Sequence, residues 1–509
     1  FRQEGNGLLI GAYEKDMKFW AEDSTPLDFA HDLFPDDLDR IMENVIRATE
    51  RVPVAASAGV KRVINGPMIW SPDSNMLWGP VPELKNYFMM GGLIPGFSQS
   101  GGLGLLAAQW MIEGEPQYDM FAWDLARFGD WADKKFTKAR VRDSYVHRFK
   151  IHFPNEERSA GRPARVRPAF EMQKNMGAVF GLNCGWEHPL WFADAPGTEE
   201  TVGFTRQNWF EPVGREAQML RDSVGVIDIS NFANYIVKGP GAHAWLDQLV
   251  ANRVPTVIGR SCLTPLISVR GGVAGDFTIT MLNDDEYMMI GSGLGERYHQ
   301  RFFNMVDMPQ GTTLEVATNR IVGFNIAGPK ARDALQRLTN ADLSNEAFRF
   351  MRSQRIQVAG MDCIALRVSF TGDLGWELHC DEGDQVALYS ALIDAAQELG
   401  GGPVGGRALG ALRIEKGYGS WSREYSQEYW PQEVGLEGLI KLDKEFLHRE
   451  AFLGIKDNAP REVLTTFEME VTKDADATGG EPIFAEDGTP VGRVTSGSYS
   501  YTVGKSLAL

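Results

Sequence analysis

The amino-acid sequence predicts an α+β fold in which the larger part of the chain repeats one strand–helix unit. The pattern Gly-Pro-x-Ala-x-x-x-Leu-x-x-Leu begins at Gly239 and begins again at Gly328. A proline after the glycine suits the first turn of a helix, where its missing N–H is not needed. A strand-like run, Tyr235–Lys238, precedes the first copy. Two such units predict two similar α+β halves, with a site between them.

Length and composition set the outer limits. A chain of 509 residues has room for about three domains. The net charge of −17 and the pI near 5.1 disfavour a polyanionic partner such as nucleic acid. No apolar run reaches the length needed to span a bilayer, so no membrane partner is expected. The cysteines show neither metal-ligand spacing nor a disulfide framework, which predicts no metal site and favours reduced thiols in a cytoplasm or mitochondrial matrix; they are Cys184, Cys262, Cys363 and Cys380.

The first region, residues 1–120, mixes short strands with helices. Apolar residues recur at helical spacing over Asp36–Val52. Further on, a strand at Phe88–Gly92 leads into a glycine-rich turn, Gly96–Gly104, that opens a helix through Ile112. Such a helix N-terminus can present backbone N–H groups to an electron-rich or anionic group. The same glycines can instead permit close packing of the helix on the strand.

Residues 121–202 are rich in Arg, Lys, Pro and aromatic residues. The tryptophans in this stretch favour a packed connector over a loose linker. His188 stands beside Glu187, but a structural histidine in an aromatic loop is the preferred interpretation over an acid–base pair.

A glycine-rich stretch organises the first half of the repeat. Gly271, Gly272 and Gly275 precede Asp276, after which apolar residues alternate with polar ones in the manner of a strand. The apolar members share one face, and Asp276 lies on the other with Thr278. One interpretation is a glycine-rich turn with a solvated aspartate. The other is that the glycines let the backbone approach something bulky and leave Asp276 beside that space.

The second half predicts a hairpin. Residues from Ile364 to Phe370 alternate as a strand, Thr371–Gly375 reads as a turn, and Trp376–His379 returns. Such a hairpin would bring Phe370 and Glu377 together at its mouth. Glu377 is then either a surface acid or a carboxylate that holds the amide-like edge of a pterin beside an aromatic ring.

Two motifs in the first region resemble the C-terminal part of the flavin domain in D-amino-acid-oxidase-like amine oxidoreductases. They are Gly66-Pro67-Met68 with Ser71-Pro72-Asp73, and Gly96-Phe97-Ser98 with Gly101-Gly102-Leu103-Gly104. The resemblance implies FAD contacts from Gly96, Phe97, Ser98 and Gln99. No G-x-G-x-x-G fingerprint opens the chain. We therefore expect the rest of the FAD site and the amine site to precede Phe1, and the chain to be a piece of a longer protein.

Residues from about 203 to 509 resemble the aminomethyltransferase of the glycine cleavage system. The resemblance implies a folate-binding domain at 203–420 and a barrel-like C-terminal part at 421–509. It is carried in order by Ile227–Ser230, Gly271–Asp276, Gly328-Pro329, Thr371–Glu377, Gly435–Glu437 and Thr495–Gly497. With the flavin motifs upstream, the whole chain is similar to the dimethylglycine dehydrogenase and sarcosine dehydrogenase group.

This resemblance implies a site and a reaction. Asp276 corresponds to the catalytic aspartate near the folate, and Glu377 to the glutamate that hydrogen-bonds the pterin. Phe370 falls where the family usually has tyrosine, and Arg407 replaces a folate-contacting arginine although its spacing to Arg413 departs from the family pattern. The implied reaction is oxidative N-demethylation of a methylated glycine with FAD, transferring the one-carbon unit to tetrahydrofolate to give 5,10-methylenetetrahydrofolate. A methylated amine and an electron-transfer flavoprotein are the implied partners.

Two alternatives are compatible with the same domains. One is a folate-dependent demethylase or methyltransferase that acts on another methylated compound without flavin turnover. The other is a non-enzymatic regulatory subunit, which the presence of both Asp276 and Glu377 disfavours.

Overall fold

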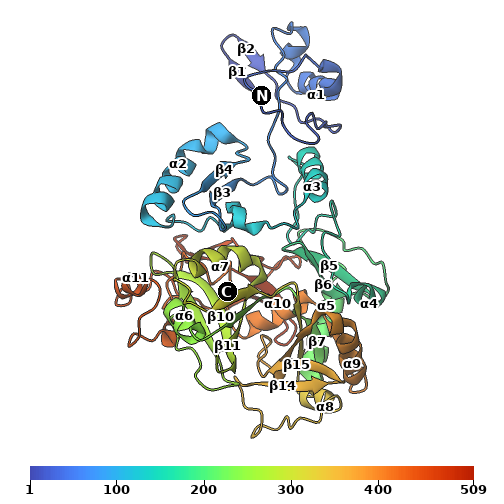
Figure 1. Ribbon diagram of the computed structural model, residues 1–509. Coiled ribbons are helices and arrows are strands. Elements are labelled where there is room, and N and C mark those ends of the chain that lie inside the picture. Colours follow the sequence, from blue (N-terminus) through green and yellow to red (C-terminus); the bar gives the residue numbers. More distant parts are fainter.

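Two β-sheets, each covered by helices, form the main body of the computed structural model, which describes residues 1–509 and confirms the α+β class. Figure 1 shows this body in green to red, with the dark blue start of the chain farthest from it. No helix combines the length and apolar character that crossing a bilayer requires.

The N-terminal region contains small strand pairs and two longer helices. Trp78 is fully buried and packs edge to face on Trp110 at 5.1 Å between ring centroids, which joins the second strand pair to its helix. The helices predicted over Asp36–Val52 and from Gly96 through Ile112 are present. The elements are β1 (Arg2–Glu4), β2 (Gly7–Leu9), α1 (Leu38–Arg51), β3 (Leu77–Pro80), β4 (Phe88–Gly91) and α2 (Gly96–Glu113).

The connecting region is a packed structure. Trp186 and Trp191 are buried on a two-stranded hairpin. Glu187 accepts a hydrogen bond at 3.0 Å from Nε of Arg162 and is therefore not the partner of His188, whose pKa burial lowers to about 4. The elements are α3 (Lys134–Val146), α4 (Phe170–Asn175), β5 (Ala178–Asn183) and β6 (Trp186–Phe192).

The first half of the repeat is built on a five-stranded antiparallel sheet in the order β12-β8-β11-β10-β9. Helices α6 and α7 contribute to the apolar core on one face of this sheet. The elements are α5 (Phe210–Asp222), β7 (Gly225–Asp228), β8 (Ala233–Lys238), α6 (Ala242–Leu249), β9 (Ser261–Ile267), β10 (Val273–Asn283), β11 (Glu286–Gly291), α7 (Glu296–Phe303) and β12 (Thr313–Val316).

The second half is built on a six-stranded sheet in the order β14-β15-β16-β13-β7-β17. Strand β7 precedes the strands of the first sheet in the chain but belongs to the second sheet, where it pairs with β13 and β17. The elements are β13 (Ile321–Ala327), α8 (Ala331–Gln336), β14 (Ser353–Val358), β15 (Met361–Leu366), β16 (Gly375–Asp381), α9 (Gln385–Gln397), β17 (Gly402–Val404) and α10 (Gly406–Glu415).

The two Gly-Pro turns have the same backbone conformation, as the repeat predicts. Gly239 has φ +123° and Gly328 has φ +125°. A Cβ at either position would lie within 2.5 Å of a backbone oxygen, from Gly311 or Leu220 respectively, so only glycine fits. Each turn joins a buried strand, β8 or β13, to a helix, α6 or α8.

The C-terminal region closes the body with small sheets in the orders β18-β22-β21 and β19-β20. Strand β21 packs along helix α10, which ties this region to the second half of the repeat. The elements are α11 (Arg449–Leu453), β18 (Phe467–Met469), β19 (Pro482–Phe484), β20 (Pro490–Arg493), β21 (Gly497–Ser500) and β22 (Lys505–Ala508).

A buried ion pair attaches the N-terminal region to the body. Arg301 of α7 forms a two-pronged ion pair with Asp124, with Nη2 to Oδ1 at 2.6 Å, and also donates to the carbonyl of Pro80 at 2.6 Å. The carboxylate of Asp124 is almost fully buried, and it accepts a further bond from the N–H of Ala126. Every oxygen of the pair is therefore satisfied without water.

We expect Asp124→Ala to lower the free energy of unfolding by about 3–5 kcal/mol, because it leaves the Arg301 guanidinium buried without its counter-charge. Urea unfolding followed by tryptophan fluorescence measures this loss. The matched control is Asp443→Ala, which removes an exposed ion pair with Arg253 and should cost about 0–1 kcal/mol. Equal losses in the two variants would contradict the structural role of Asp124.

Candidate functional site

The two sheets face each other across a small apolar layer. This layer joins residues of the first sheet to residues of the second, and its buried members are Ile236, Leu282, Met288, Ile290, Ala317, Ile321 and Leu366. The opposite face of each sheet packs against helices in a separate and larger core. In both sheets, successive side chains of a strand therefore point alternately into the layer between the sheets and toward the helices.

Asp276 points into the layer between the sheets. Thr278 pairs directly with Ile290 across β10 and β11, and directly opposed residues of a sheet share a face. Ile290 belongs to the apolar layer, so Thr278 and, by alternation, Asp276 lie on that side. Phe277, between them, belongs instead to the core beneath the helices.

Glu377 points into the same layer from the other sheet. It pairs directly with Leu366 across β15 and β16, and Leu366 is a member of the apolar layer. Its neighbours in the strand, Trp376 and Leu378, belong to the core beneath α8 and α9. The two carboxylates predicted to contact folate therefore project from opposite sheets into one layer.

The carboxylate of Asp276 forms no hydrogen bond or ion pair with another residue. The side chain is half-buried, and burial raises its pKa to about 6. The negative charge of Asp276 also affects the phenol of Tyr425. The pKa of this phenol is raised to about 12, chiefly by burial and next by Asp276. A carboxylate with a pKa near neutrality and no partner can hold or release a proton near physiological pH.

Glu377 and His379 form a second group of polar side chains without partners. Glu377 accepts no hydrogen bond, and its Oε2 lies 3.5 Å from Nε2 of His379. Both ring nitrogens of His379 are buried without a hydrogen-bond partner. Buried polar groups are nearly always satisfied, so this group fits a ligand that brings its own donors and acceptors, as the amide-like edge of a pterin does.

The glycines before Asp276 have a different role from the one the sequence suggests. A Cβ at Gly272 would lie 2.2 Å from the carbonyl oxygen of Gln427, and one at Gly275 would lie 2.6 Å from Nε2 of His299. Gly271, with φ +87°, faces the backbone of Ala451 in the same way. The bulky group that these glycines admit is thus the protein itself, and the expected glycine-lined cleft for a ligand is not formed.

Phe370 does not lie in the predicted hairpin register. Strand β15 ends at Leu366, so a loop over residues 367–374 replaces the short turn that the sequence suggests. The hydroxyl of Ser369 in this loop forms hydrogen bonds with the hydroxyl of Thr371 at 2.8 Å and with the side chain of Asn325 on β13 at 3.2 Å. These polar groups are therefore satisfied without strand pairing. Phe370 stacks on Tyr418, with ring centroids 6.0 Å apart, rather than beside Glu377 in register.

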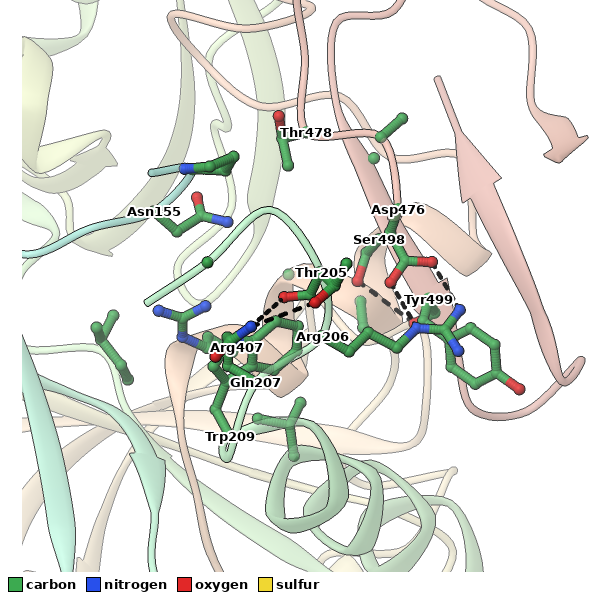
Figure 2. A pocket seen from close by; sticks show the side chains of 18 of the residues that line it. Asn155, Thr205, Arg206, Gln207, Trp209, Arg407, Asp476, Thr478, Ser498 and Tyr499 are labelled. Carbon is green, nitrogen blue, oxygen red and sulfur yellow. Dashed lines mark hydrogen bonds and ion pairs between the residues drawn. The ribbon is translucent and has the colours of Figure 1, made fainter. Parts of the chain in front are cut away.

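Arg407 lies apart from the other predicted folate contacts. It stands on the first turn of α10, donates to Glu200, and places its guanidinium 4.8 Å from the ring centroid of Trp209 (Figure 2). It lines a cavity of about 290 Å³ that Asp276, Glu377 and Phe370 do not line. The structure thus brings Asp276 and Glu377 to one layer and leaves Arg407 elsewhere.

The cavity beside Arg407 contains ion pairs that the sequence did not assign to a site. Arg206 donates to both oxygens of Asp476 at 2.8 Å and lies 4.2 Å from the ring centroid of Tyr499 (Figure 2). Arg413 donates to Ser496 at 2.6 Å, so the Thr495–Gly497 motif forms one wall. The motifs were visible in the sequence, but their pairing joins positions too distant in the chain for spacing to reveal.

The predicted FAD contacts form the first turn of α2. This helix has no side-chain cap at its N-terminus, so the backbone N–H groups of the turn formed by Gly96, Phe97, Ser98 and Gln99 stay available. Phe97 is fully exposed, and Oε1 of Gln99 is buried without a partner. Free N–H groups fit an electron-rich cofactor edge, and the unsatisfied amide oxygen of Gln99 fits a hydrogen-bond donor of the cofactor.

Comparison with solved structures defines the class of protein. The aminomethyltransferase T of the glycine cleavage system from Bartonella henselae superposes with a TM-score of 0.58 and 22% identity, covering 68% of this chain and 88% of that one. The two-sheet body therefore has the aminomethyltransferase fold. This confirms the predicted fold of the larger part of the chain.

Family models then place the chain. The GCVT N-terminal domain matches residues 169–444, preceded by the FAD dependent oxidoreductase central domain at 113–166 and followed by the Glycine cleavage T-protein C-terminal barrel domain at 463–509. Since the first of these covers more than half of the chain, the chain belongs to the GCVT family.

The relatives combine the same regions. Human mitochondrial dimethylglycine dehydrogenase is 36% identical over 518 residues, which cover 100% of this chain and 59% of the relative. The 4-methylaminobutanoate oxidase (formaldehyde-forming) of Paenarthrobacter nicotinovorans is 31% identical over 521 residues, covering 100% and 62%. The predicted resemblance to the dimethylglycine and sarcosine dehydrogenase group is confirmed. The chain spans about three fifths of the length of these relatives.

A buried carboxyl group supports the first turn of α10. Glu216 of α5 accepts hydrogen bonds from the N–H groups of Phe192 at 2.6 Å and Gly405 at 2.8 Å. Burial raises its pKa to about 8, since these two bonds only partly offset the cost of desolvating the charge. Glu216 thus joins β6, α5 and the start of α10, where Arg407 stands.

The raised pKa of Glu216 predicts a pH dependence of stability. The folded state keeps the proton up to about pH 8, whereas the unfolded chain releases it near 4.5, so the free energy of unfolding falls as pH rises between these values. Glu216→Gln cannot ionise and should flatten this part of the profile. Urea unfolding of both proteins at several pH values measures the difference in slope. Parallel profiles would contradict the assignment.

Proposed function

We propose that this protein catalyses oxidative N-demethylation of a methylated glycine, of the dimethylglycine or sarcosine type, and transfers the one-carbon unit to tetrahydrofolate to give 5,10-methylenetetrahydrofolate. The observation that carries the proposal is the pair of unpartnered carboxylates, Asp276 and Glu377, that project into one layer of an aminomethyltransferase fold. The dimethylglycine dehydrogenase relatives, similar over the whole chain, support the choice of amine.

Asp276 is the proposed proton acceptor. When bound, FAD would take up a hydride equivalent from the N-methyl amine, and reduced folate would offer the nitrogen that receives the one-carbon unit. With a pKa of about 6, Asp276 is mostly ionised at neutral pH and can accept the proton which that nitrogen loses. Proton transfer of this kind is typically worth about 10²–10⁴ in rate.

Glu377 is the proposed anchor of the pterin. Its unpartnered oxygens accept hydrogen bonds without breaking an existing one, and His379 beside it offers further unsatisfied nitrogen atoms. Phe370, stacked on Tyr418, is proposed to offer an aromatic face to the same ligand. Arg407 remains a predicted folate contact, and the ligand would reach it through the cavity that Arg407 lines.

The first turn of α2 is the proposed flavin contact in this chain. Gly96, Phe97, Ser98 and Gln99 would hold an edge of FAD through the free N–H groups of the turn. All four cysteines are free thiols. Together with the mitochondrial relatives this supports a mitochondrial matrix or bacterial cytoplasm, where an electron-transfer flavoprotein would accept the electrons.

The decisive variant is Asp276→Asn in the flavin-loaded enzyme. Amine oxidation should continue, while formation of methylenetetrahydrofolate falls by about 10²–10⁴-fold and formaldehyde accumulates. Quantifying both one-carbon products during amine turnover measures the effect. Asp284→Asn, in the exposed turn after the same strand, serves as the control. Unaltered folate product would remove Asp276 from the reaction.

Glu377→Gln tests folate binding separately from proton transfer. Loss of a hydrogen bond to a charged group costs about 1.5–3 kcal/mol, so the Kd for tetrahydrofolate should rise at least tenfold while the KM for the amine stays constant. Fluorescence titration with folate measures the Kd. Asp362→Asn, exposed on the adjacent strand β15, is the matched control. A Kd equal to that of the control would show that Glu377 does not contact the ligand.

A further inference from the structure

Strand β10 contains a bulge immediately before Asp276. Val273 pairs with Ile267 and Gly275 pairs with Leu266 on β9, so one residue of β10, Ala274, has no counterpart. Because strand side chains alternate, one extra residue exchanges the two faces for everything that follows. The bulge therefore decides on which face Asp276 lies.

The core contacts record this exchange of faces. Ala274 and Phe277 both belong to the core beneath α6 and α7, although their positions differ by three and strict alternation would place them on opposite faces. Asp276 lies between them and points to the other side. Without the bulge, regular pairing onward from Val273 would turn the carboxylate toward the apolar core.

Two buried side chains hold the carbonyl that the bulge releases from the sheet. The oxygen of Ala274 accepts a hydrogen bond from Nε1 of Trp421 at 2.8 Å, and Nε2 of His299 lies 3.2 Å from it. A carbonyl has no proton to give, so the His299 proton is on Nε2 and that nitrogen is the donor. Both side chains are buried, and burial lowers the pKa of His299 to about 3, which keeps the ring neutral.

The two donors are themselves held rigidly. The rings of His299 and Trp421 pack with centroids 4.9 Å apart, and the ring centroid of Phe277 also lies 4.9 Å from that of His299. The missing side chain at Gly275 makes room for the imidazole. The backbone of Trp421 also forms an isolated β-bridge with the backbone of Tyr425, and the charge of Asp276 helps to raise the pKa of the Tyr425 phenol. The donors, the bulge and the carboxylate thus form one connected unit.

We propose that His299 and Trp421 are positioning residues for the one-carbon transfer: through their shared hydrogen bonds to the Ala274 carbonyl they hold the bulge that aims Asp276 into the layer between the sheets. This inference rests on the proposed function of Asp276. Neither side chain touches the ligand layer directly, so both act through the backbone of β10.

The test uses Trp421→Phe, His299→Phe and the double variant in the flavin-loaded enzyme. Phenylalanine keeps an aromatic ring at both positions and removes the N–H donor; at Trp421 it also removes part of the indole volume, a loss that the tryptophan control below shares. We expect amine oxidation to be unchanged. In the double variant, formation of methylenetetrahydrofolate should fall by about tenfold to hundredfold, because misplacing a catalytic group by about 1 Å has an effect of this order. Formaldehyde should rise to match. His299→Gln, which retains an N–H donor, should recover part of the transfer.

The matched control is Trp245→Phe. Nε1 of Trp245 donates to the carbonyl of Val306 at 3.0 Å in the same apolar core, away from the bulge. This variant loses an equally buried hydrogen bond and should lower the melting temperature without altering the ratio of the two one-carbon products. A product ratio that shifts as much in Trp245→Phe as in Trp421→Phe would overturn the proposal, as would normal transfer in the double variant.

Hydrogen exchange separates this inference from the proposed function. If Asp276→Asn leaves folate transfer intact, the proposed role of Asp276 fails, but the positioning of the bulge is still measured by amide exchange over residues 273–280. The double variant should exchange faster in this segment than Trp245→Phe does, because the bulge has lost both of its donors. Equal protection in the two proteins would overturn the positioning role.

Discussion

The contact between the two sheets is the constraint on which the candidate site depends. Each sheet has one face packed under helices, so the inner faces of the two sheets meet in the layer between them. Apolar residues fill part of this layer and hold the halves at a fixed separation. Asp276 and Glu377 lie on the same side as that apolar contact, one from each sheet. Glu377 pairs with Leu366 of the layer, and Thr278, two residues from Asp276 on the same face, pairs with Ile290.

The electrostatic contrast between this layer and the neighbouring cavity supports the assignment of roles. In the cavity, Arg206 and Arg407 are paired with acidic side chains, and such pairs stabilise the junction between the connecting region, α10 and the C-terminal region. In the layer, Asp276 has no counter-charge, and burial raises its pKa to about 6. Charges that a protein leaves unpaired in a partly buried position are those available to a ligand or to proton transfer.

The junction between the N-terminal region and the two-sheet body leads to the same strand. Glu115, just after α2, accepts hydrogen bonds from the hydroxyl of Ser268 and the N–H groups of Val269 and Arg270. This turn leads directly into β10 and its bulge. The helix that carries the predicted flavin contacts and the strand that carries Asp276 are therefore joined through one buried carboxyl group, whose pKa burial raises to about 6.

The sequence by itself determined the α+β class, the repeat marked by the Gly-Pro turns, and the order of the flavin-like and aminomethyltransferase-like regions, and it singled out Asp276 and Glu377 as candidates. These follow from local periodicity and from ordered motifs, which a chain carries whether or not it is folded. Only the tertiary structure decided that the glycines before Asp276 admit the protein's own His299 and Gln427, that Phe370 lies in a loop, and that Arg407 belongs to another cavity. The bulge at Ala274 could not be predicted from the sequence either. The two side chains that donate to its carbonyl come from distant segments of the chain. A single unpaired residue also cannot be recognised in the alternating pattern before the strand pairing is known.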